Sequence, residues 1–212
     1  MQKPPAAKKP ASLRKKPLQS RSQFTLGALQ EAFVRVLIER GFEKITIREV
    51  VSVAGIGVGT FYDYVPNLRA LAASTIHKRC TDSATALRQA IAPLVGQSFA
   101  AHTQVLLQTL IKEGFGKPKE WTALLLLERQ VSSAAALRTI HEDYVGIWAE
   151  ALRQSGDKPP EDKLIGVARM AHALSYGWYS HDLLFYADDP KHRRSMDDIA
   201  KVITGLVPAS LT

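Results

Sequence analysis

Two histidine–carboxylate pairs are the residues of this sequence that would best suit acid–base catalysis. His141 is followed by Glu142, and His181 is followed by Asp182. Adjacent side chains on a helix point about 100° apart, so we expect neither pair to form a catalytic couple by itself. A helical enzyme with its active site in the C-terminal part stays an alternative, but the sequence favours a protein that is not an enzyme.

His77 and Cys80 are the residues most nearly spaced as metal ligands. They are three positions apart and would lie on one helix face, but two ligands without a supporting carboxylate make a weak metal site. The sequence contains no His-Glu-x-x-His, no Walker loop and no Gly-x-Ser-x-Gly. We therefore expect no metal, no cofactor and no catalytic residue.

Arg48 has the chemistry to bind a nucleic-acid base, because its guanidinium can donate two hydrogen bonds to guanine O6 and N7. It lies in the stretch ITIREVVSVAGIGVGTFYDYVPNLRAL, residues 45–71. Thr46 with Glu49 three residues later predicts a capping box at the start of a short helix. Gly55 ends that helix, since glycine enters the left-handed conformation without steric cost. Arg48 could instead pair with a nearby glutamate.

A second short helix is expected from about Gly57 to Tyr64, with Phe61 turned inward. Pro66 ends it, and Asn67 caps the helix that follows. Two short helices joined by a tight glycine turn are typical of a helix-turn-helix. Helical hairpins of this kind also occur in proteins that never bind nucleic acid, so spacing alone leaves both interpretations open.

The residue types in this stretch resemble those of the TetR family of bacterial transcriptional regulators. The resemblance covers about residues 25–71 and beyond that rests on length and helical layout. It is carried by Gly41-Phe42, Thr46, Ala54-Gly55-Ile56, Gly59-Thr60-Phe61-Tyr62-Asp63-Tyr64 and Asn67 to Leu71.

The resemblance implies a helix-turn-helix that binds double-stranded DNA, with two recognition helices in successive major grooves of a near-palindromic operator. Arg48 is the expected base contact, and the hydroxyl and backbone of Thr46 and Thr60 are expected at phosphates. The residues expected at the DNA are Thr46, Arg48, Gly57, Val58, Thr60, Tyr62, Asp63, Tyr64 and Arg69.

Three positions depart from the family's pattern. Gly57 and Val58 stand where a serine and a polar or cationic residue are more usual, and Val58 could contact only a thymine methyl. Leu68 stands where a lysine usually pairs with phosphate, and Arg69 could replace it. These departures suggest fewer cationic contacts from the folded part of the chain.

Positive charge is concentrated at the N-terminus. The net charge is +8, yet Met1 to Ser22 holds seven basic residues and no acidic one, which leaves 21 basic against 20 acidic residues elsewhere. This proline-containing segment has little to bury and is expected to be a disordered basic arm. It would lie along DNA phosphates or in the minor groove, or it would be a solubilising tail without contacts.

The rest of the sequence predicts helices only. The first is expected from Ser22 or Gln23 to Arg40, so that three helices make the DNA-binding unit. The expected later helices are Asn67 to Ile91, Phe99 to Ile111, Glu120 to Gln130, Ala134 to Gln154, Glu161 to Tyr186 and Met196 to Leu206.

The helix from Glu161 to Tyr186 has two apolar stripes. One contains Val167, Ala171, Leu174, Trp178 and Phe185, and the other contains Ile165, His172, Tyr176, Tyr179 and Leu183. A helix that is apolar on two sides must be buried on both. We therefore expect the last two helices to form a four-helix homodimer interface with their copies, as TetR-like proteins do; a central helix of a monomeric bundle is the alternative.

A small-molecule pocket is expected among the C-terminal helices, lined by aromatic residues with polar groups. Each of these residues could instead be plain core. The candidates are His102, Trp121, Tyr144, Trp148, Tyr176 and Trp178.

The sequence therefore predicts an all-α regulator with a basic arm (1–22), a helix-turn-helix domain (23–68) and a helical effector-binding and dimerisation domain (69–212). A single cysteine, no long apolar run and no signal-peptide pattern favour the cytoplasm. The expected function is a repressor that an unidentified small molecule releases from its operator. A DNA-binding protein without an effector is the alternative.

Overall fold

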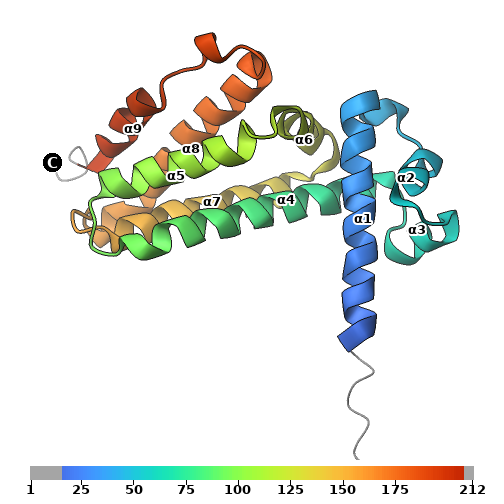
Figure 1. Ribbon diagram of the computed structural model, residues 1–212. Helices are drawn as coiled ribbons and strands as arrows, with labels where there is room; N and C mark the ends of the chain where they lie inside the picture. Colours follow the sequence, from blue (N-terminus) through green and yellow to red (C-terminus); the bar gives the residue numbers. More distant parts are fainter. Residues whose placement is uncertain (1–15, 208–212) are drawn as a thin grey trace, which may run out of the picture.

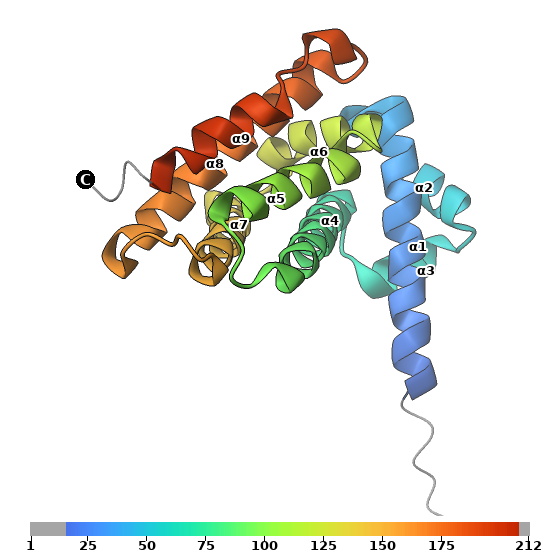
Figure 2. The same ribbon diagram turned by 60° about the vertical axis from the view of Figure 1, so that its left-hand side comes forward.

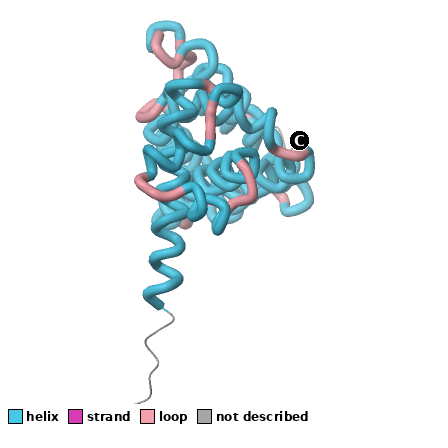
Figure 3. Tube along the Cα trace, turned by 90° about the vertical axis from the view of Figure 1, so that its right-hand side faces the viewer, coloured by secondary structure: helices cyan, strands magenta, loops and turns pink. Residues whose placement is uncertain are grey.

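The structure, a computed structural model, describes residues 16–207, with side chains from residue 22 onward (Figure 1). Every regular element in this range is a helix, and the range contains no strand (Figure 3). The predicted all-α fold, with an N-terminal helix-turn-helix domain and a helical second domain, is confirmed.

Three helices form the N-terminal head: α1 (Lys16–Arg40), α2 (Ile47–Ala54) and α3 (Val58–Tyr64), with a 3-10 turn η1 (Phe42–Lys44) after α1. The capping box at Thr46 and Glu49 is present, and Gly55 ends α2 with φ 69° in the left-handed region. In Figure 1, α2 and α3 lie on the side of α1 that faces away from the long C-terminal helices. The local signals of the sequence therefore produce the expected turn between α2 and α3.

The start of α1 differs from the expectation. The helix begins at Lys16 rather than at Ser22 or Gln23, so the last residues of the expected arm are helical. Pro17 falls in the first turn, where a helical residue has no backbone hydrogen bond to donate, so the proline does not oppose the helix. The remainder of the arm, residues 1–15, lies outside the described residues.

Within the described residues, six helices follow the head, with two 3-10 turns among them. Asn67 caps α4 through its side-chain oxygen, which accepts a hydrogen bond from the Ala70 backbone N–H at 2.8 Å. The elements are α4 (Leu68–Ile91), η2 (Ala92–Leu94), α5 (Phe99–Gly114), α6 (Pro118–Val131), α7 (Ala134–Gln154), α8 (Glu161–Tyr186), η3 (Pro190–His192) and α9 (Met196–Thr204).

Two hydrophobic cores stabilise the described residues. The head core joins α1, α2 and α3 to the first turns of α4, and it includes Phe33, Phe61 and Leu71, each fully buried. The body core fills the space between α4, α5, α7, α8 and α9 (Figure 2). Helix α6 supplies residues to both cores, so it joins the head to the body.

The reasoning from two apolar stripes on α8 was wrong in one respect. Both stripes are largely buried inside a single chain, because α8 packs on α5, α6, α7 and α9 at once. Only Ile165 and Phe185, at opposite ends of the two stripes, are exposed. The stripes alone therefore do not require a second subunit, and a case for a dimer must rest on the residues that stay outside.

No helix among residues 16–207 is both long and apolar enough to cross a membrane.

Candidate nucleic-acid interface and effector pocket

Helix α3, the expected recognition helix, packs on the rest of the head through Phe61, which is fully buried in the head core. Gly57 is its N-cap and makes no side-chain cap. The outer surface of α3 presents Val58, Gly59, Tyr62 and Asp63 to solvent. These residues are free to approach a groove of DNA, although none of them is a cation.

Arg48 is exposed on α2 and has no ion pair or hydrogen bond from its side chain within residues 22–207. Its neighbour Glu49 faces other partners: it accepts from Thr46 N at 3.0 Å and lies 3.8 Å from Arg40 Nη2. The hydrogen bonds from Thr46 lower the pKa of the Glu49 carboxyl. Arg48 is therefore available to a base, and the alternative of a pair with a glutamate does not occur.

Thr46 uses its hydroxyl inside the protein. The hydroxyl donates to Glu49 Oε2 at 2.9 Å and accepts from Glu49 N at 3.2 Å. Because the backbone N–H of Thr46 also donates to Glu49, a phosphate at this position would have to compete with the capping box.

The other residues expected at the DNA fall into two groups. Thr60 and Tyr64 are half-buried, and Tyr64 packs against the head core, whereas the ring of Tyr62 is exposed and meets Phe61 edge-on at 5.3 Å. Arg69, exposed at the start of α4, donates from Nη2 to the carbonyl oxygen of Gln130 at 2.7 Å. One end of the Arg69 guanidinium therefore contacts the last turn of α6 rather than solvent.

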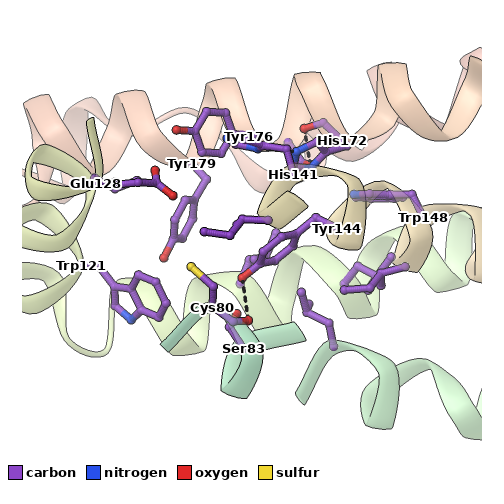
Figure 4. Close-up of a pocket in the computed structure, with 17 residues that line it drawn as sticks. Cys80, Ser83, Trp121, Glu128, His141, Tyr144, Trp148, His172, Tyr176 and Tyr179 are labelled. Carbon is purple, nitrogen blue, oxygen red and sulfur yellow. Dashed lines mark hydrogen bonds between the residues drawn. The ribbon is translucent and has the colours of Figure 1, made fainter. Parts of the chain in front are cut away.

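A cavity lies between α4, α5, α6, α7 and α8 in the body (Figure 4). It encloses about 70 Å³, less than the roughly 300–1,000 Å³ of a typical small-molecule site, so a ligand would have to displace lining side chains. Its lining combines aliphatic residues of α4 to α7 with aromatic and polar side chains. The lining residues are Cys80, Ser83, Leu87, Leu106, Leu110, Trp121, Leu125, Glu128, Ile140, His141, Tyr144, Ile147, Trp148, His172, Ser175, Tyr176 and Tyr179.

Four of the six residues expected in a pocket line this cavity: Trp121, Tyr144, Trp148 and Tyr176. Whether they bind an effector stays a prediction.

His102 and Trp178 do not line the cavity. His102 is fully buried one helical turn before Leu106, the first lining residue of α5, and its Nδ1 lies 3.0 Å from Ser98 O. Trp178 lies two positions after Tyr176 on α8, which turns its ring to nearly the opposite face and into the body core.

The sequence analysis missed the polar residues of the cavity, above all Glu128, His141 and His172. A signal existed for one of them, because His172, Tyr176 and Tyr179 recur at helical spacing on α8. The burial of Glu128 had no such signal, since glutamate is rarely buried without a partner.

Burial sets the charge state of the lining. The imidazoles of His141 and His172 are joined by a 3.0 Å hydrogen bond, Nδ1 to Nε2. Burial lowers the pKa of His141 and lowers that of His172 to about 4. Burial likewise raises the pKa of the Cys80 thiol to about 12 and raises that of the Tyr144 and Tyr179 phenols. All five groups are neutral at physiological pH.

Burial also raises the pKa of the Tyr176 phenol, which leaves Glu128 as the last titratable group of the lining. Its side chain has no hydrogen-bond or ion-pair partner in the part of the chain that the structure describes. Burial raises the pKa of its carboxyl, and the positive charge of Arg129 opposes that shift. At neutral pH, Glu128 is therefore the only side chain in the described lining that can carry a charge.

His181 and Asp182 meet although they are sequence neighbours, contrary to expectation. His181 Nδ1 lies 3.1 Å from Asp182 Oδ1, and the backbone N–H of Arg194 donates to Asp182 Oδ2 at 2.8 Å. Asp182 is fully buried, and Arg194 Nη1 also lies 3.3 Å from Oδ1. The cluster anchors the segment before α9 to α8, away from the cavity.

The geometry thus defines a helix-turn-helix protein whose second domain carries an internal, largely apolar cavity. Residues 30–75 match the family described as bacterial regulatory proteins, tetR family. The head of this chain is therefore similar to that of TetR-family regulators, which supports a DNA-binding transcriptional regulator.

Solved structures share the fold over almost the whole chain. A TetR-family transcriptional regulator from Mesorhizobium loti has a TM-score of 0.66 at 15% identity and covers 90% of this chain and 96% of its own. A transcriptional regulator from Pseudomonas aeruginosa has a TM-score of 0.68 at 18% identity, with 92% of each chain covered. The fatty acid degradation regulator FadR from Bacillus halodurans has a TM-score of 0.64 at 17% identity and covers 86% of this chain and 94% of its own. No curated protein matches the sequence.

Proposed function

We propose that this protein is a ligand-released repressor: a homodimer that binds a near-palindromic operator in the bacterial cytoplasm and leaves it when a small molecule enters the cavity of the body. It performs no catalysis in this role and needs no cofactor.

Helix α6 carries this proposal, because its two faces belong to the two functional units. Trp121 and Glu128 line the cavity together with Leu125. On the other face, Leu124 and Leu127 are buried in the head core with α1 and α4. A ligand that displaces the cavity face of α6 therefore displaces side chains on which the head is packed, and interiors of this density transmit such shifts.

Polar contacts reinforce the link between α6 and the head. Arg79 of α4 forms ion pairs with Glu31 of α1 at 2.9 Å and Glu120 of α6 at 2.7 Å. Arg69, at the start of α4, donates to Gln130 at the end of α6. Because α4 directly follows α3 in the chain, a movement of α6 reaches the recognition helix through these contacts. The ligand then shifts the population between DNA-binding and released states.

Exposed apolar side chains on α8 and α9 support a dimer through the last two helices. Ile165, Met170 and Phe185 of α8 and Val202 of α9 are 45%, 52%, 68% and 56% exposed. Clusters of exposed apolar residues on a surface favour association, and a two-fold pair is the commonest form of it. Met170 and Phe185 lie about 60° apart around α8, so a four-helix arrangement with the partner chain would bury both, whereas Ile165 lies about 140° or more from each.

We propose that DNA is bound by Arg48, the surface of α3 from Gly57 to Tyr64, and Thr46 and Arg69 at its edges. The division into an arm, a DNA-binding domain at 23–68 and an effector domain at 69–212 describes these roles. It does not follow the packing, since Leu71 of the effector domain belongs to the head core.

The proposal is tested by selecting bound sequences from random duplex DNA with the full-length protein at near-physiological salt. We expect one near-palindromic sequence to be enriched. Arg48→Ala should then reduce affinity for that sequence roughly tenfold to a hundredfold, as loss of a bidentate guanine contact does. Arg153→Ala, which removes an exposed cation of α7, is the matched control and should leave affinity within about twofold.

A protein that still enriches no sequence after unfolding and refolding to remove bound ligand would refute operator recognition. Enrichment with no compound able to release the DNA would instead identify a DNA-binding protein without an effector. A screen for compounds that raise the melting temperature separates these cases, because any ligand of the folded protein stabilises it.

A further inference from the structure

Glu128 is an isolated acidic group inside the cavity. Its side chain is 6% exposed and has no hydrogen-bond or ion-pair partner among the described residues. Arg129, the next residue on α6, is exposed and forms no ion pair with it. Figure 4 shows the Glu128 side chain directed from α6 into the pocket alongside Tyr176 and Tyr179. A buried carboxylate without a partner is costly and calls for a compensating charge or a proton.

Aromatic rings line several sides of the cavity that this carboxyl group enters. They come from α6, α7 and α8, and their faces carry partial negative charge that attracts cations. Tyr179 meets Trp121 edge-on at 6.5 Å, so part of this wall is fixed by ring packing. The rings that line the cavity are Trp121, Tyr144, Trp148, Tyr176 and Tyr179.

Cationic side chains are absent from the described lining, so an anionic ligand would find none there and would be repelled by Glu128. The two lining histidines stay neutral near pH 7, because burial lowers the pKa of both. The cavity therefore combines one carboxyl group, which can become negatively charged, with aromatic and aliphatic walls.

We propose that the effector of this protein is an organic cation with an aromatic or aliphatic body, bound with its ammonium group at Glu128. This assignment rests on the proposed effector role of the cavity. The rings contribute cation–π contacts, the aliphatic residues cover the body of the ligand, and Glu128 neutralises its charge. Glu128 and Trp121 lie on the cavity face of α6, so the ion pair acts directly on the helix that joins the body to the head.

Cation binding and proton release are coupled at this site. In the empty cavity, burial raises the pKa of the Glu128 carboxyl and favours its protonated form. A bound cation favours the ionised form, so affinity for a permanently charged ligand increases with pH until Glu128 is ionised in the free protein. The titratable and charged groups around Glu128 are Arg79 and Cys80 of α4, Arg129 of α6, His141 and Tyr144 of α7, and His172, Tyr176 and Tyr179 of α8; Arg79 shares a small neighbouring cavity with Glu128 and is held by Glu31 and Glu120.

The test uses three probes of similar size that differ in charge: benzyltrimethylammonium, its neutral isostere neopentylbenzene, and phenylacetate. Binding to the full-length protein is measured by calorimetry and tryptophan fluorescence at mildly alkaline pH. We expect the cation to bind at least about tenfold more tightly than the neutral isostere, and phenylacetate to bind most weakly.

Two variants locate the charge that is responsible. Glu128→Gln keeps the shape of the side chain and should weaken binding of the cation about tenfold or more, with little change for neopentylbenzene. Glu142→Gln is the matched control, since it removes an exposed carboxylate of α7 that pairs with Arg169, and it should leave all three affinities unchanged.

Several results would overturn the assignment. They are equal or tighter binding of the neutral or anionic probe, an unchanged cation affinity in Glu128→Gln, and no binding of the cation at millimolar concentration. The comparison of the three probes on the unmodified protein tests the assignment of a cationic ligand even if Glu128→Gln does not fold.

Release of the selected DNA is measured separately with the same probes. A cation that binds at Glu128 without releasing DNA would refute the repressor mechanism but would still support the proposed cation site at Glu128. Release by the neutral probe alone would support the repressor mechanism and refute the site.

Discussion

Arg79 of α4 and Glu31 of α1 are joined across 48 positions of the sequence, with Nη2 of the guanidinium 2.9 Å from both carboxylate oxygens. The same guanidinium lies 2.7 Å from Glu120 of α6. Hydrogen bonding to Arg79 lowers the pKa of the Glu31 carboxyl. One side chain thus connects the first helix of the head, the helix that leaves the head and the helix that lines the cavity.

Replacement of Arg79 should lower the free energy of unfolding. Arg79→Met leaves the carboxylate of Glu120, whose side chain is only 12% exposed, without its cation. We expect the free energy of unfolding in urea to fall by about 1–3 kcal/mol. Arg153→Met breaks the exposed pair with Glu161 and should cost no more than about 0.5 kcal/mol. An equal decrease in the free energy of unfolding of the two variants would show that Arg79 and its partners contribute no more than an ordinary surface ion pair.

The turn between α2 and α3 can be tested with two glycines. Gly55 has φ +69° while Gly57 does not have a positive φ, and a Cβ at either position would meet no atom within 4 Å. Gly55→Ala should therefore lower the free energy of unfolding by about 1–2 kcal/mol through backbone strain alone. Gly57→Ala should be neutral within about 0.5 kcal/mol. A similar cost at both positions would contradict the role of the left-handed residue.

The helix ends and the turn of the head could be predicted from the sequence, because the residues that determine them lie close together in the chain. The capping box involves residues three positions apart, and Gly55 and Asn67 each act on their own helix end. The bounds of α7 and α8 were predictable for the same reason, since apolar periodicity within one helix is enough.

The composition of the cavity was only partly predictable, because it depends on how helices rotate against each other. Trp178 has the same chemistry as Trp148, yet it faces the body core while Trp148 lines the cavity. Glu128 lies on the same face as Trp121 and Leu125, at helical spacing, but nothing local reveals that this face of α6 is covered by α8. Burial of a charge is a tertiary property, and so is the contact between His141 and His172.

The histidine pair should make stability depend on pH. Burial and the proximity of His141 lower the pKa of His172 from 6.5 to about 4 in the folded state. The unfolded chain therefore binds more protons between these values, and stability falls as pH decreases from 6.5 toward about 4. The loss from this group would be up to about 3 kcal/mol.

His172→Gln removes that titration and keeps a polar partner for His141. We expect a flatter dependence of the free energy of unfolding on pH over this window, measured by urea denaturation at several pH values. His77→Gln is the control, because His77 is exposed and its side chain has no hydrogen bond or ion pair among the described residues, so the slope should stay unchanged. The same slope in His172→Gln and the unmodified protein would mean that other groups cause the acid sensitivity.

The basic arm should set the salt dependence of DNA binding. Deletion of residues 1–15 removes Lys3, Lys8, Lys9, Arg14 and Lys15 and stops where α1 begins. If the arm lies on phosphates, the slope of log affinity against log salt should decrease by about 0.9 for every phosphate that the deletion leaves without a cation. The measurement is a fluorescence anisotropy titration of the selected operator at several salt concentrations.

A variant with the five arm cations changed to glutamine keeps the length of the chain and should reproduce the effect of the deletion. Since the head contributes few other free cations, we expect the slope to decrease more in this variant than in Arg48→Ala. An unchanged slope in both arm variants would identify the arm as a solubilising tail and leave the cations of the head, among them Lys44, Arg48 and Arg69, to contact the operator.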